Sequence, residues 1–66
     1  MNPDSAKATI LLAAEDSLKT TFGNYIKQSA SGDRKAAEEF EAGARLVINI
    51  EQKALNIIEK IFKETI

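Results

Sequence analysis

The sequence predicts an all-α fold, an antiparallel hairpin of two long helices that is completed by a partner chain or by a homodimeric four-helix bundle. A single cluster of small residues at 29–33 divides the chain. Neither flanking segment alternates like a strand, and both are rich in Ala, Glu, Lys and Leu. The second segment also has a wider apolar arc than one neighbouring helix covers. We therefore expect one domain over 1–66, with helices at about 3–29 and 34–64 and a turn at 30–33.

The length of the chain favours association with another chain. At 66 residues it lies near the lower limit for a domain that folds without disulfides, metals or oligomerisation. The sequence contains no Cys and no His, which removes disulfides, thiolate metal sites and the commonest zinc ligand. Of the three usual ways to stabilise so short a chain, only oligomerisation is compatible with this composition.

The first helix has a clear start and one apolar stripe. Asn2 suits the N-cap, Pro3 the first helical position, and Asp4 the positive end of the helix dipole. At about 100° per residue, one stripe collects most of the large apolar side chains. It consists of Leu11, Ala14, Leu18, Phe22, Tyr25 and Ile26, flanked by Ile10 and Leu12.

The turn follows from Gly32 and Asp33. Gly32 suits the left-handed position that ends a helix, and Asp33 or Ser31 suits the next N-cap. So short a turn makes the helices antiparallel, so that residues whose numbers sum to about 63 face each other. This sets Phe22 and Tyr25 opposite a segment in which one large residue stands among small ones, namely Ala37, Phe40, Gly43 and Ala44. Gly43 predicts close helix packing, with a helix break there and a three-helix bundle as the alternative.

The second helix carries surplus apolar surface. With Phe40, Val47, Ala54 and Ile61 at heptad position a, its apolar side chains also fill positions b, d and e. The apolar arc spans roughly 160°, against about 100° for one packing surface. If the a and d positions pack on the first helix, a contiguous patch remains for a partner. The predicted partner-binding residues are Ile48, Leu55, Ile58 and Phe62.

Several classes of function are disfavoured. Nine basic and ten acidic residues give a net charge of −1, which provides no field for nucleic acid. Glu15 and Glu51 come close in the predicted pairing, but helical metal sites also use His, so we expect no metal and no cofactor. No serine has a base to activate it, and no phosphate-binding loop is present, so we expect no enzymatic activity and no small-molecule substrate. The polar face of the second helix carries Asn and Gln with mixed charges and is not Lys-rich like that of membrane-surface helices, so binding to a membrane is not expected. No signal peptide is evident, and we expect a cytoplasmic protein.

The second half of the chain resembles a known family in several places. These are the Gly32-Asp33 turn, the aromatic Phe40, and the segments Ile50-Glu51-Gln52 and Asn56-Ile57-Ile58. In these features the chain resembles the YscE-type co-chaperones of type III secretion. The resemblance implies a two-helix protein that holds an export substrate together with a helical-repeat partner.

Together these observations predict a non-enzymatic protein-interaction module. It would be a small helical adaptor or co-chaperone that buries the apolar face of its second helix on another protein. The alternative is a self-associating structural subunit, either a four-helix dimer or a repeating assembly.

Overall fold

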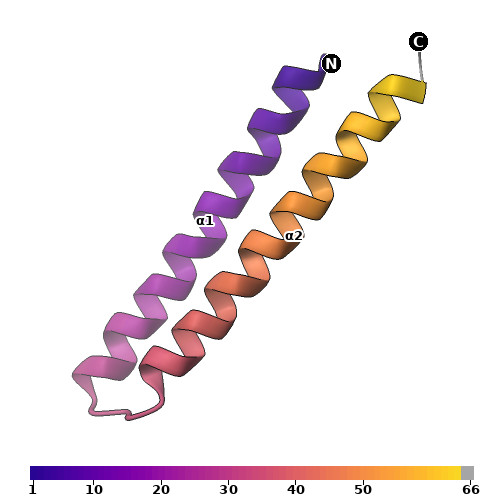
Figure 1. Ribbon diagram of the computed structural model, residues 1–66. Helices are drawn as coiled ribbons and strands as arrows, with labels where there is room; N and C mark the ends of the chain where they lie inside the picture. The colour runs from indigo at the N-terminus through magenta and orange to yellow at the C-terminus, as the bar shows by residue number, and fades with distance from the viewer. Residues whose placement is uncertain (65–66) are drawn as a thin grey trace.

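The computed structural model describes residues 1–64, which form two helices, α1 (Pro3–Ala30) and α2 (Ala36–Glu64). They lie side by side and antiparallel, with the start of α1 and the end of α2 opposite the turn (Figure 1). The all-α hairpin predicted from the sequence is confirmed. The molecule is a thin rod of 54 × 16 × 8 Å. Its radius of gyration is 15.5 Å, against about 11 Å for a compact domain of this length.

The start of α1 matches the sequence prediction. Asn2 has an extended backbone, and its Oδ1 accepts a hydrogen bond of 2.7 Å from the backbone N–H of Ser5. Pro3 occupies the first turn, where its missing N–H leaves no bond unmade, and Asp4 follows. The cap of Asn2, the fixed φ angle of Pro3 and the negative charge of Asp4 therefore all favour a helix that begins at residue 3.

The turn is a complete Schellman motif. The N–H of Gly32 donates to the carbonyl of Ser29 (3.1 Å), and the N–H of Asp33 donates to that of Gln28 (3.0 Å). Gly32 has a φ of +82°, as predicted. Asp33 Oδ1 accepts a 2.9 Å hydrogen bond from the N–H of Lys35. Because residues 34 and 35 form this capped turn, α2 begins at residue 36, two residues later than predicted.

Replacing Gly32 with valine should lower the free energy of unfolding by about 1–2 kcal/mol, because a β-branched side chain is strained at positive φ. Nothing lies within 4 Å of a Cβ placed at Gly32, so the loss would come from backbone strain and not from a clash. Urea unfolding of the variant measures it. The matched control is Gly23→Val, at a helical glycine that also has open space around it. A Gly32 variant as stable as the parent would show that the turn is built differently.

The helix α2 runs without interruption through Gly43, so the predicted alternative of a helix break and a third helix is wrong. Gly43 instead serves close packing. A Cβ built on it would lie 3.1 Å from Thr21 Cγ2, tighter than ordinary contact. Thr21 is itself held in place, because its Oγ1 donates to the carbonyl of Ser17 (2.9 Å). The numbers of Thr21 and Gly43 sum to 64, close to the predicted pairing rule.

Small residues form the seam between the helices. Within residues 1–64, the buried apolar side chains are all alanines, and no large side chain is fully buried. The stripe predicted for α1 is correct in part. Ala14 is buried and Leu18 and Tyr25 are half-buried, but Leu11, Phe22 and Ile26 are exposed. The inward residues lie on a neighbouring arc, because small side chains there allow the two backbones to approach and push the larger ones to the flanks. The buried residues are Ala6, Ala14 and Ala36.

Candidate protein-interaction surfaces

The structure places the four predicted partner-binding residues unequally. Ile48 is 45% exposed, as a partner surface requires. The other three, Leu55, Ile58 and Phe62, are half-buried. These three therefore offer a partner less of their surface than Ile48 does, because α1 already covers part of it.

The most exposed apolar edge of α2 lies elsewhere. Four large aliphatic side chains on this edge are between 49% and 60% exposed. The positions predicted to pack on α1 include Ile61 at heptad position a and Ile50 and Ile57 at position d. For these three residues the prediction is wrong, because an arc of roughly 160° is wider than the part that α1 covers. Here α1 packs on the side of α2 that carries Phe40, Val47 and Ile58, and Ile50 and Ile57 lie outside the contact. We name this edge the isoleucine ridge, formed by Leu46, Ile50, Ile57 and Ile61.

Placing the residues on both helices at about 100° each puts exposed apolar groups on opposite faces of the hairpin. The isoleucine ridge defines the first, the ridge face, where α1 contributes a stripe of small and polar residues. That stripe contains Ala13, Ser17 and Thr20, which are exposed. The second, the aromatic face, carries Leu11, Phe22 and Ile48, with Leu55 and Phe62 half-buried beside them.

A shallow apolar hollow of about 250 Å³ lies at mid-length between the helices. Small side chains create it, because alanine and serine of α1 fail to fill the space beside α2. Its lining includes Ala13 and Ser17 of the small stripe and Ile50 of the ridge, which indicates an opening on the ridge face. The remaining lining residues are Ile10, Ala14, Val47, Glu51 and Ala54.

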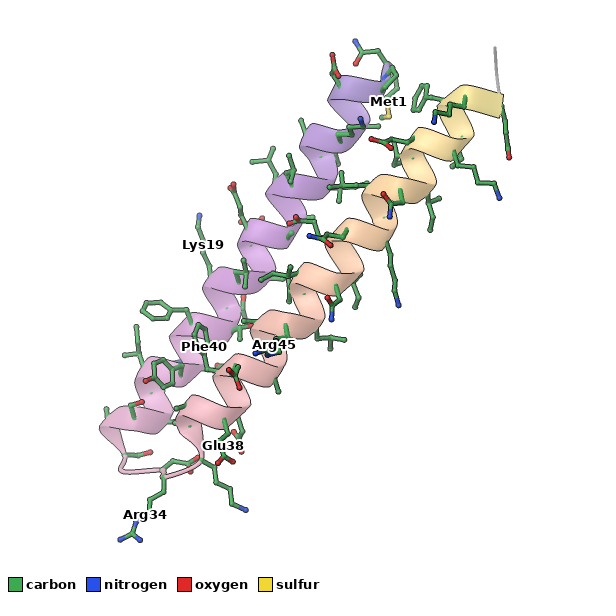
Figure 2. All side chains as sticks on the ribbon, in the orientation of Figure 1. Met1, Lys19, Arg34, Glu38, Phe40 and Arg45 are labelled. Atoms are coloured by element: carbon green, nitrogen blue, oxygen red, sulfur yellow. The ribbon has the colours of Figure 1, made fainter. Side chains whose placement is uncertain are left out.

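An aromatic cluster holds the helices together near the turn. The ring of Phe40 stacks on that of Tyr25 with centroids 4.9 Å apart, and meets Phe22 edge-on at 5.9 Å. Figure 2 shows Phe40 between the two helices close to the turn. Towards the open end, Lys7 Nζ lies 3.0 Å from Glu59 Oε1 and joins α1 to α2. Both ends of this ion pair are solvent-exposed, so it adds little stability.

Within the part of the chain that the structure describes, no group of three acidic, His or Cys side chains is placed to hold a metal. Glu51 lines the apolar hollow, while Glu15 is exposed. A second hollow of about 150 Å³ near the turn is more polar and includes Thr21, Asn24 and Gln28 in its lining. Neither helix, over residues 1–64, is long and apolar enough to cross a membrane. The features that stand out are therefore the two apolar faces.

Comparison with models of protein families, with curated proteins and with solved structures found no match for this chain. The resemblance to YscE-type co-chaperones therefore stays a prediction from the residues that suggested it.

Proposed function

We propose that this chain is a non-enzymatic protein-interaction module, a small cytoplasmic adaptor or co-chaperone whose hairpin binds a helical partner protein through its apolar surface. Burial supports the proposal most directly. A domain normally draws its stability from large side chains removed from water, and here the buried side chains among the described residues are three alanines. The hairpin needs further apolar burial to be stable.

The accessible surface supports the same conclusion. The chain exposes 5282 Å², whereas a compact protein of its mass, 7.2 kDa, exposes about 4,100 Å². The difference is about 1,200 Å², more than the roughly 800 Å² that one partner contributes to an interface of standard size. At about 25 cal/mol per Å² of apolar area, covering a third of it, about 400 Å², adds about 10 kcal/mol. That is comparable with the whole stability of a small domain.

The aromatic face is the surface we assign to the partner protein. Ile48, which the sequence predicts to bind a partner, is exposed, and Leu11 and Phe22 of α1 are exposed apolar groups on the same face. The accessible parts of Leu55 and Phe62 extend the surface towards the open end. Large aliphatic and aromatic groups along two helices suit the apolar side of an amphipathic helix. The resemblance to YscE-type co-chaperones also favours a helical partner.

The stability of the purified chain tests the proposal. At low micromolar concentration and without a partner, we expect a free energy of unfolding below about 3 kcal/mol and amide protection that is lost within minutes. Urea unfolding and hydrogen exchange measure the two quantities. A monomer that unfolds cooperatively with 5 kcal/mol or more would contradict the proposal, because such a chain has no need of a partner.

A further inference from the structure

We propose that the ridge face is a self-association surface on which a second copy of this chain stacks with its turn at the same end. The isoleucine ridge of each copy would lie along the small stripe of α1 in the other. The result is a four-helix bundle with a twofold axis along the rod, in which every neighbouring helix is antiparallel. The inference rests on the proposed function, since both begin from a hairpin that lacks a core of its own.

The area agrees with a second copy as the occupant. A dimer interface of standard size removes about 800 Å² from each chain, and the excess surface of this hairpin is about 1,200 Å². The area buried by one contact between the isoleucine ridge and the small stripe is therefore smaller than the excess surface, and part of the excess stays exposed. The aromatic face, on the opposite side, remains open for another protein in such a dimer.

The shapes on the ridge face are complementary to each other. A twofold axis along the rod places α2 of one copy over α1 of the other at the same height. Positions along the rod follow from the contact between Thr21 and Gly43: a residue of α1 and a residue of α2 lie level when their numbers sum to 64. Ile50 of the second copy then lies level with Ala13 and Ser17, over the apolar hollow that those residues line. A large side chain of one copy therefore meets small ones of the other at the middle of the interface.

Charge favours this arrangement over the other twofold stacking. With the turns at opposite ends, α2 would lie over α2, and the Lys53 side chains beside the two ridges would approach each other. With the turns at the same end, the two Lys53 side chains lie instead on opposite edges of the bundle. This avoids the approach of like charges, which favours one stacking without adding much affinity.

The first experiment compares two isoleucines that are two residues apart on α2. Ile50 is on the ridge and 56% exposed, whereas Ile48 is on the aromatic face and 45% exposed. One chain has a mass of 7.2 kDa, and by sedimentation equilibrium we expect the parent and Ile48→Lys to have twice that mass. For Ile50→Lys we expect the Kd of self-association to rise at least tenfold. A monomeric parent, or a dimer disrupted by Ile48→Lys and not by Ile50→Lys, overturns the inference.

The second experiment is disulfide cross-linking, which is possible because the sequence contains no native cysteine. A single cysteine in place of one ridge residue leaves the rest of the ridge apolar. Ala13→Cys and Ile50→Cys chains, carrying tags of different mass, are mixed and oxidised. We expect the mixed disulfide to form at least tenfold faster than with Lys19→Cys, since Lys19 points away from α2 (Figure 2). Faster linkage between Ile50→Cys and Ile57→Cys would show the opposite stacking and overturn the inference.

The two proposals can fail separately. A marginally stable chain that stays monomeric and gives no mixed disulfide overturns self-association alone and leaves the interaction module standing. A stable monomer overturns both.

Discussion

Replacing Val47 with glutamate should unfold the hairpin under conditions in which the parent is folded. Val47 lies at the centre of the inward side of α2, half-buried and beside the apolar hollow. A carboxylate there would lose solvation and would lie one helical turn from Glu51, a like charge in the same hollow. The expected loss is about 2–4 kcal/mol, which approaches the whole stability of so small a domain. Far-ultraviolet circular dichroism measures it.

Glutamate is a better helix former than valine, so a loss of helix in this variant would come from burial and not from helix propensity. The matched control is Asn49→Glu, two residues further along α2 at an exposed position. We expect the control to retain the helical signal of the parent. If Val47→Glu were as helical as that control, Val47 would not face α1.

Replacing Phe40 with alanine should have the second largest effect, a loss of about 2–4 kcal/mol. Phe40 joins the helices near the turn through its stacked contact with Tyr25 and its edge contact with Phe22. Truncation removes both ring contacts and leaves a gap where the hairpin is held closed. Thermal unfolding measures the loss of stability. Near-ultraviolet circular dichroism, to which Tyr25 contributes the only tyrosine signal, reports the loss of the cluster.

Phe40→Leu is the control for this prediction, because leucine keeps most of the apolar volume and removes the ring contacts. We expect it to lower the free energy of unfolding by about 1 kcal/mol. Equal losses in the two variants would mean that stacking adds most of the stability at this position. No loss in either would show that the cluster does not hold the turn end together.

The helices and the turn could be predicted because local chemistry determines them. Asn2 and Pro3 begin α1 through a cap and a preset φ angle, and Gly32 ends it through a conformation that other residues rarely adopt. The pairing register followed from the turn, since a Schellman motif and a short capped segment leave little freedom in the return path. The start of α2 was placed two residues early because the capped turn beside Asp33 extends through Lys35.

The direction of the apolar faces could not be predicted from one chain. The width of the arc on α2 is visible in the sequence, but width alone does not say which part of it the neighbouring helix covers. In the structure, the close contact between Thr21 and Gly43 and the aromatic cluster around Phe40 set the rotation of α2. These tertiary contacts turned Ile50 outward and Leu55 partly inward. The exposed apolar surface of α2 was predicted, but of its most exposed residues only Ile48 was placed correctly.

Dependence of stability on protein concentration tests most directly whether the hairpin is completed by another copy of itself. For a dimer that unfolds to separate chains, each tenfold rise in concentration adds about 1.4 kcal/mol to the apparent stability. Urea unfolding over about two orders of magnitude in concentration should therefore show midpoints that rise steadily for the parent and for Ile48→Lys. Ile50→Lys should show a lower midpoint that stays constant. A parent midpoint that is high and independent of concentration would contradict the account, because two helices with a seam of alanines would then be stable alone.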